Sequence, residues 1–181
     1  MGKTNRLRQY VNQDIRIRLP DDKKIQNIKW ISVWDIRAQK NFADLYIPEG
    51  FLPPALQVIA ELSQLSNDVR SEPVVIVDAK TIRIADFRFD GFRKNVYFWV
   101  GNGPQPNSGG QKIPNELGYL EPLSSYQDDL VILELPGNLT VFEIDYLSVW
   151  DTEVGENLGS VIIPQELNIP PASSQVIVSK L

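Results

Sequence analysis

Residues 144–150 read IDYLSVW, and the fold can be worked out starting from this stretch. Apolar side chains occupy both alternating faces of the segment, which is typical of a central β-strand that is covered on both sides. The tetrapeptide SVWD at residues 148–151 also occurs at residues 32–35. The sequence therefore predicts the same kind of strand at two places in the chain.

The match around these two strands extends without a gap from residues 10–48 to residues 126–164, at a constant offset of 116. Eleven of the 39 paired positions are identical. This period is too long for a solenoid repeat of roughly 20–50 residues, so it indicates tandem domains. We expect residues 1–50 to be the C-terminal part of a first module and residues 69–166 to be a complete second module. We expect residues 51–68 to be a linker, and residues 167–181 a C-terminal linker.

Strand patterns dominate the second module. Residues 81–84 alternate between apolar and polar side chains, and residues 96–100 are aromatic and β-branched. Residues 130–135 are a further strand, whose copy at residues 14–19 alternates between polar and apolar side chains. These patterns predict an all-β fold, either an antiparallel β-sandwich or a barrel-like module. Residues 53–65 show a partial helical stripe after Pro53 and Pro54, which predicts a short linker helix.

The composition excludes several classes of function. The chain has no Cys and no His, which rules out disulfides, thiolate zinc sites, Ser-His-Asp triads and His-ligated haem. Its net charge is 18 − 23 = −5, so it lacks the basic balance of a nucleic-acid-binding protein. No stretch approaches the roughly 18–20 apolar residues of a membrane span, so we expect no membrane insertion by this segment.

Two features suggest a ligand site, and each has a simpler interpretation. Residues 101–118 are rich in Gly, Pro, Asn and Ser, and faintly resemble a phosphate-binding loop. They lack the Gly-Lys-Ser/Thr ending of such a loop, so a long surface loop is favoured. Trp34 and Trp150 could form a ligand platform, but a Trp that recurs at the same place is more often a core residue of a β-sandwich.

Carboxylates are the main acid–base groups of the chain. A glycosidase-like pair or a calcium site is conceivable, although no spacing matches a known metal loop, and solvated turn residues are the more common case. The carboxylates in question are Asp35, Asp86, Asp90, Asp128, Asp129 and Asp151.

Asn138 begins a motif for covalent modification. Asn138-Leu139-Thr140 fits the N-glycosylation sequon and follows a Pro-Gly turn. Because a single sequon often arises by chance, it favours the secretory route only mildly.

The ordered motifs of the chain resemble the tandem Skeletor-type module of the DM-thirteen family, which is associated with DOMON domains. The motifs are AKTIRIADFRFDG at residues 79–91, VYFWVG at 96–101, LP at 135–136, LSVW at 147–150 and VIIP at 161–164. The resemblance implies an all-β module in an extracellular or cell-surface protein. It also implies electron transfer, through haem or a reactive cysteine, or a structural role in a spindle matrix. The family pattern has Cys after Ser-Val-Trp and a His before the first strand, where this chain has Asp35, Asp151 and Asn67.

We therefore expect a non-catalytic β module that acts as a structural or interaction unit of a larger Skeletor-like matrix or cell-surface protein. The alternatives are an electron-transfer module, with tyrosine as the remaining haem ligand, and carboxylate-based binding of calcium or glycans. We expect no cofactor. The expected partners are other proteins, or a second copy through the incomplete first module, and not nucleic acid. The expected location is extracellular or at the cell surface, with the nucleus or spindle matrix as the alternative.

Overall fold

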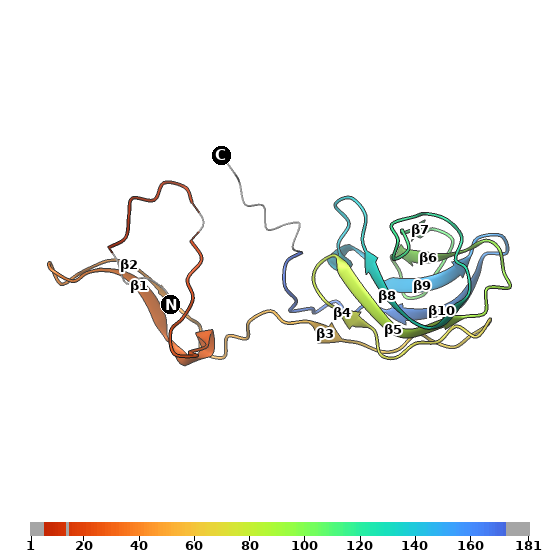
Figure 1. Cartoon of the computed structure of the whole chain (residues 1–181), viewed down its shortest axis with the longest axis horizontal. Coiled ribbons are helices and arrows are strands. Elements are labelled where there is room, and N and C mark those ends of the chain that lie inside the picture. Colours follow the sequence, from red (N-terminus) through yellow and green to blue (C-terminus); the bar gives the residue numbers. More distant parts are fainter. Residues whose placement is uncertain (1–5, 14, 173–181) are drawn as a thin grey trace. The chain divides into compact units, whose positions relative to one another are not determined.

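The computed structural model describes residues 6–13 and 15–172 and divides the chain into two units, Met1–Pro53 and Pro54–Leu181 (Figure 1). Apart from two short 3₁₀ turns, the regular elements of the described residues are β-strands. The strands pair antiparallel throughout, which confirms the prediction of an all-β, antiparallel sandwich-like fold. Within the same residues, no helix is long and apolar enough to cross a membrane.

The second unit contains two four-stranded sheets. One has the order β3-β4-β5-β8 and the other the order β10-β9-β6-β7. The strands of the first sheet are β3 (Gln57–Val58), β4 (Val75–Ile76), β5 (Thr81–Phe89) and β8 (Tyr126–Glu134). Those of the second sheet are β6 (Val96–Gly101), β7 (Gln111–Lys112), β9 (Tyr146–Asp151) and β10 (Glu156–Ile162).

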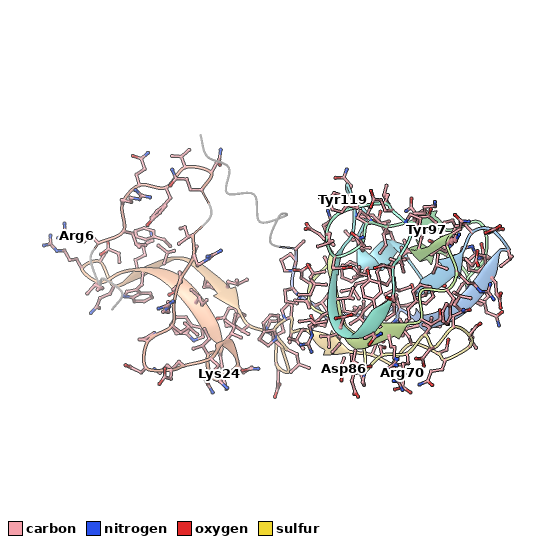
Figure 2. The ribbon with its side chains drawn as sticks, turned by 45° about the vertical axis from the view of Figure 1, so that its right-hand side comes forward. Arg6, Lys24, Arg70, Asp86, Tyr97 and Tyr119 are labelled. Carbon is pink, nitrogen blue, oxygen red and sulfur yellow. The ribbon has the colours of Figure 1, made fainter. Side chains whose placement is uncertain are left out.

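The main core lies between the inner faces of these two sheets, where the side chains fill the interior (Figure 2). Alternation places Ile82 and Ile84 of β5 inside, and a bulge after Ile84 resets the strand so that Phe87 is also buried. The ring of Phe87 packs 4.9 Å from that of Tyr126 and 5.4 Å from that of Phe98. The two sheets are thus joined by aromatic contacts at their centre.

The segment predicted as a linker helix is extended, and that prediction is wrong. Residues 57–60 pair with β4, since the N–H of Ile59 donates to Val74 O at 2.8 Å. Further along, the N–H of Ser63 donates to Ser160 O at 2.8 Å, on the outer edge of β10. Residues 57–66 therefore run from the edge of one sheet to the edge of the other, and they belong to the second unit rather than to a linker. Two long-range edges satisfy this backbone, which outweighs a weak local helical pattern.

Part of the predicted C-terminal linker is also packed against the second unit. The carbonyl of Asn168 accepts from Ala55 N, and the carbonyl of Pro170 accepts from Ala79 N, both at 3.0 Å. Ile169 and Ala172 are buried. Residues 167–172 therefore extend the folded unit, whereas residues 173–181 lie outside the described part of the chain.

The first unit repeats part of the second one, element by element. Its η1 turn (Ile25–Asn27) and its strands β1 (Trp30–Asp35) and β2 (Lys40–Tyr46) correspond at the offset of 116 to the η2 turn (Val141–Glu143), β9 and β10. Both hairpins carry a bulge at the same place. In contrast, residues 15–19, which were predicted as a strand, form none, because no equivalent of β5 lies among the described residues of the first unit for them to pair with.

Candidate functional site

The β1–β2 hairpin exposes the side chains that its copy in the second unit buries. Trp30 is 56% exposed whereas its counterpart Tyr146 is 0% exposed, and Trp34 is 53% exposed whereas Trp150 is 5% exposed. Other exposed residues of the hairpin have fully buried or nearly buried counterparts: Val33, Phe42 and Leu45 correspond to Val149, Leu158 and Val161. The prediction that Trp34 is a core residue is therefore wrong, because the described residues of the first unit contain no counterpart of Trp99, which stacks on Trp150 in the second unit.

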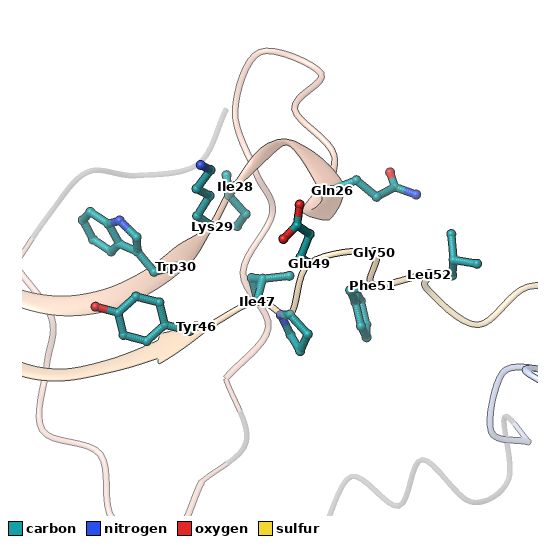
Figure 3. Close-up of a pocket in the computed structure, with 11 residues that line it drawn as sticks. Gln26, Ile28, Lys29, Trp30, Tyr46, Ile47, Glu49, Gly50, Phe51 and Leu52 are labelled. Carbon is teal, nitrogen blue, oxygen red and sulfur yellow. The ribbon is translucent and has the colours of Figure 1, made fainter.

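A cavity of about 530 Å³ opens beside the start of β1 (Figure 3). Trp30 and Tyr46, which are cross-strand partners, form one wall, and Phe51 lies further along the chain. Lys29 and Glu49 supply opposite charges at the same cavity. This combination of aromatic walls and two charges is typical of a cavity that binds a ligand.

In the second unit, a loop fills the corresponding space. The N–H of Gly103 donates to the carboxylate of Asp145 at 2.7 Å, and the indole N–H of Trp99 donates to Asn107 O at 3.0 Å. A Cβ at Gly110 would collide with the Trp99 indole nitrogen, so glycine is required for this close approach. The loop of residues 101–110, which was interpreted as a surface loop, therefore covers the outer face of the sheet.

Beneath this loop lies a second aromatic cluster, separate from the main core. Trp99 stacks on Trp150 with ring centroids 6.0 Å apart and planes inclined by 17°, and Tyr146 completes the cluster. The ammonium group of Lys112 lies 3.4 Å from the centroid of the Tyr97 ring. Trp150 is buried as predicted, but on the outer face of the sheet rather than between the sheets. The sequence could not show this, because the covering loop acts from a distant part of the chain.

Asp151 occupies the position where the family pattern has a cysteine, and its carboxylate is fully engaged. Arg93 Nη1 lies 3.1 Å from Asp151 Oδ2, and the N–H of Glu153 donates to Asp151 Oδ1 at 2.9 Å. Burial alone would raise the pKa of Asp151, but these hydrogen bonds outweigh it and hold the pKa below its ordinary value. Asp35 makes the same turn, accepting from the N–H groups of Arg37 and Ala38. Both aspartates therefore act as turn-forming groups.

Asn67, at the position of the family's histidine, is also structural. Its side-chain amide donates to the carboxylate of Asp90 at 3.1 Å, and its backbone carbonyl accepts from the backbone N–H of Asp90 at 3.0 Å. Asp86 lies exposed in the β5 bulge, on the outer surface beside the segment that carries Arg70 (Figure 2).

The Asp128-Asp129 pair, considered as a calcium site, is occupied by other contacts. Arg88 Nη1 lies 3.4 Å from the Asp128 carboxylate, and Arg70 Nη2 lies 3.8 Å from it. Asp129 accepts from Gln127 N at 2.8 Å. Within the described parts of the chain, no group of three or more acidic side chains is placed to hold a metal ion.

The residues present do not fit a haem group. Cys and His are absent from the sequence, and a tyrosine ligand must lose its proton. The hydroxyl of Tyr126 donates to Glu116 at 3.0 Å, and burial together with this carboxylate raises the pKa of Tyr126 well above its ordinary value. The hydroxyl of Tyr146 is held against the backbone of Asn107. These two buried tyrosines are therefore not suited to bind iron, and the ring of the third one, Tyr97, is covered by the ammonium group of Lys112.

Asn138 lies exposed in the turn that follows β8, where the N–H of Leu139 donates to Pro136 O at 3.1 Å. Thr140, the third residue of the sequon, donates its hydroxyl to Glu143 Oε2 at 3.1 Å in the capping box of η2. The asparagine itself is accessible from solvent, whereas the threonine is already engaged.

Comparisons with known proteins agree with the internal repeat. Residues 1–47 and 61–163 match the family described as "Electron transfer DM13". The chain is 37% identical over 178 residues to two forms of Protein Skeletor from Drosophila melanogaster, isoforms B/C and isoforms D/E. The match covers 98% of this chain, but only 23% and 12% of those two relatives. No solved structure matches the chain.

The two segments that match the family correspond to the two units described above, and the match covers more than half of the chain. The identity to the Drosophila proteins extends over nearly its whole length. This chain therefore belongs to the DM13 family and is similar to part of Skeletor.

Proposed function

We propose that this chain is a non-catalytic structural or interaction unit of a larger Skeletor-like protein. The observation that carries the proposal is the β1–β2 hairpin, which exposes the apolar side chains that β9 and β10 bury. An exposed apolar patch beside an open strand edge is typical of a surface that binds another polypeptide. The side chains that redox and acid–base sites most often use, Cys and His, are absent from the sequence, which also favours a binding role.

For the larger protein we propose an extracellular or cell-surface location, with the nucleus or a spindle matrix as the alternative. The support is the exposed position of Asn138 in its turn, since a glycosylation acceptor must be accessible in a secreted protein. A glycan found on Asn138 in animal cells would support the first location. Nuclear staining of the unglycosylated protein would support the second one.

Self-association of the purified chain tests the binding role. We expect light scattering at tens of micromolar protein to show species heavier than the monomer, and Trp34→Ser to reduce them, because it removes an exposed indole from the hairpin. Phe92→Ser is the matched control, since Phe92 is also highly exposed but lies on the second unit. A clean monomer at all concentrations would contradict self-association, and an equal effect of both substitutions would show that the hairpin is not the binding surface. Heat on titration with calcium or simple sugars would instead favour a carboxylate site.

Electron transfer is the second candidate, and the stacked Trp99–Trp150 pair favours it. Two indoles at 6.0 Å can share the electron deficiency left when an external one-electron oxidant removes an electron from one of them. The test is photo-oxidation by a ruthenium polypyridyl complex with persulfate as the electron acceptor. A long-lived tryptophan radical that is lost in Trp99→Phe and kept in Trp34→Phe would support this candidate. Equal radical lifetimes in the two variants would remove it.

A further inference from the structure

The second unit shows what covers a hairpin of this kind. There, β6 lies along the edge of β9 in antiparallel register, from Val96 opposite Asp151 to Gly101 opposite Tyr146. In the first unit, β1 pairs with β2 and with no other strand among the described residues. The edge of β1 that corresponds to the β6 side of β9 is therefore open.

We infer that the β1–β2 hairpin binds the N-terminal half of another module of this family, the part equivalent to residues 54–125. A strand like β6 would pair with β1, and the loop after that strand would enter the cavity beside Trp30. The inference rests on the proposed interaction role and names the partner of that surface. The second unit indicates this partner, because there β9 and β10 form one sheet with β6 and β7, which belong to that half.

The pairing can be specified residue by residue. Because Val100 pairs with Leu147 in the second unit, the equivalent of Val100 pairs with Ile31 in the first one. The equivalent of Phe98 pairs likewise with Val33. A slip of one residue would turn each side chain of the added strand to the opposite face, so we expect the register that β6 and β9 have in the second unit.

The charges at the cavity determine which hydrogen-bonding groups the partner's loop must present there. In the second unit, the carboxylate of Asp145 accepts from the N–H of Gly103 and from the side-chain amide of Gln165. The first unit has Lys29 in place of Asp145 and Glu49 in place of Gln165. An ammonium group can only donate, so the loop that enters this cavity must present an oxygen where residues 101–110 present an N–H.

The steric fit also differs between the two hairpins. A Cβ on Gly159 would collide with Cγ1 of Val69 and with the backbone oxygen of Ser63. The first unit has Ala43 at that position. The partner's segment must therefore lie further away there, because a residue smaller than Val69 would not relieve the collision with the backbone oxygen. The partner is thus a half-module related to residues 54–125. Residues 54–125 themselves fit the β1–β2 hairpin imperfectly.

A chain with two complete modules tests the inference. Residues 54–125 are added directly before Tyr10 in place of residues 1–9, because Tyr10 corresponds to Tyr126 at the repeat offset. One version keeps the natural hairpin, and the other has Lys29→Asp and Ala43→Gly. Amide hydrogen exchange of residues 30–46 is compared with that of residues 146–162, which serve as the internal standard for a folded module.

We expect the version with Lys29→Asp and Ala43→Gly to slow the exchange of residues 30–46 at least 100-fold relative to the unextended chain. The version with the natural hairpin should slow it less. A Gly/Ser extension of equal length is the control and should leave the exchange unchanged. If neither version slows the exchange of residues 30–46 while residues 146–162 stay protected, the inference is wrong.

A disulfide tests the register independently, since the natural chain has no cysteine. Ile31→Cys is combined with Val100→Cys in the added half or, as the matched control, with Val96→Cys in the added half. The two valines lie four residues apart on one strand, about 13 Å, so both cannot come within disulfide distance of residue 31. Cross-linking through position 100 alone is the expected result. Equal cross-linking, or cross-linking through position 96, would overturn the inferred register.

These outcomes separate the inference from the proposed function. If the unextended chain is a clean monomer but the extended chain protects its hairpin, the inferred partner is correct and self-association is not the role of the surface. If the unextended chain associates but neither extension protects the hairpin, the surface binds a different kind of partner.

Discussion

Asp35 and Asp151 show how one residue can have the same local role in two different settings. Each accepts backbone N–H groups two and three residues later and so forms the hairpin turn. Only Asp151 has an arginine partner among the described residues, and its side chain is nearly buried. The identical sequence therefore produces an ion pair in the second unit alone.

Asp151→Asn should lower the free energy of unfolding by about 1–3 kcal/mol at neutral pH, because it removes a charged hydrogen-bond acceptor from Arg93. The pKa of Asp151 is lowered in the folded state, so the stabilisation is present above the unfolded-state pKa and is lost as pH falls through the folded value. Denaturant titrations of both proteins should therefore differ at pH 7 and converge well below pH 4.

Asp35→Asn is the control for this prediction. It keeps an oxygen that can accept from the turn, and no described cation pairs with Asp35, so its effect should stay within about 0.5 kcal/mol. Equal effects of the two substitutions, or a difference that does not depend on pH, would show that the Arg93 contact does not stabilise the fold.

Asn138 gives a prediction that bears on location. Because its side chain is exposed in a turn, we expect the protein expressed through the secretory route of animal cells to carry a glycan at this position. A mass decrease on glycosidase treatment, absent in Asn138→Gln, is the measurement. An unmodified wild-type chain recovered from the medium would contradict the prediction.

At the scale of elements, the segment from residue 57 to residue 66 links the two sheets. It pairs with β4 at one end and with β10 at the other, and Leu62 between them is 1% exposed in the main core. We expect Leu62→Ala to cost about 2–5 kcal/mol of unfolding free energy, as other buried Leu→Ala changes do. Leu56→Ala, at an exposed position directly before this segment, should cost about 0.5 kcal/mol or less. Denaturant titration measures both, and equal small effects would restore the linker interpretation.

The strands that could be predicted from the sequence are those with strong local patterns. The alternation at residues 81–84 and the aromatic run at residues 96–100 correspond to β5 and β6. The prediction failed where pairing is long-range. Residues 57–66 become extended only because β4 and β10 offer open edges, and residues 15–19 remain irregular because the described part of the first unit has no equivalent of β5.

The same contrast applies to the candidate site. The second copy of the hairpin could be predicted from the repeat, since residues 10–48 match residues 126–164 without a gap. The cavity beside Trp30 could not, because it depends on how residues 47–52 fold beside the start of β1. The position of the Trp99–Trp150 pair could not either, because it depends on where the loop of residues 101–110 folds back. No local pattern in that loop shows that it would cover an aromatic face.

At the scale of the whole molecule, the chain contains two copies of one hairpin that differ in how far other segments cover them. The second copy is closed by β6 and by residues 63–66, whereas the first has an open edge and exposed faces. A two-stranded hairpin has little stability of its own in water. We therefore expect the backbone hydrogen bonds of the first hairpin to open far more often than those of the second.

Hydrogen exchange of the unmodified chain at low micromolar concentration measures this difference most directly. The amides of β9 and β10 should exchange slowly, near the limit set by global unfolding of the second unit, and those of β1 and β2 should exchange at least 100-fold faster. Similar protection of residues 30–46 and 146–162 in the monomer would contradict the account, because it would mean that the first hairpin is already complete.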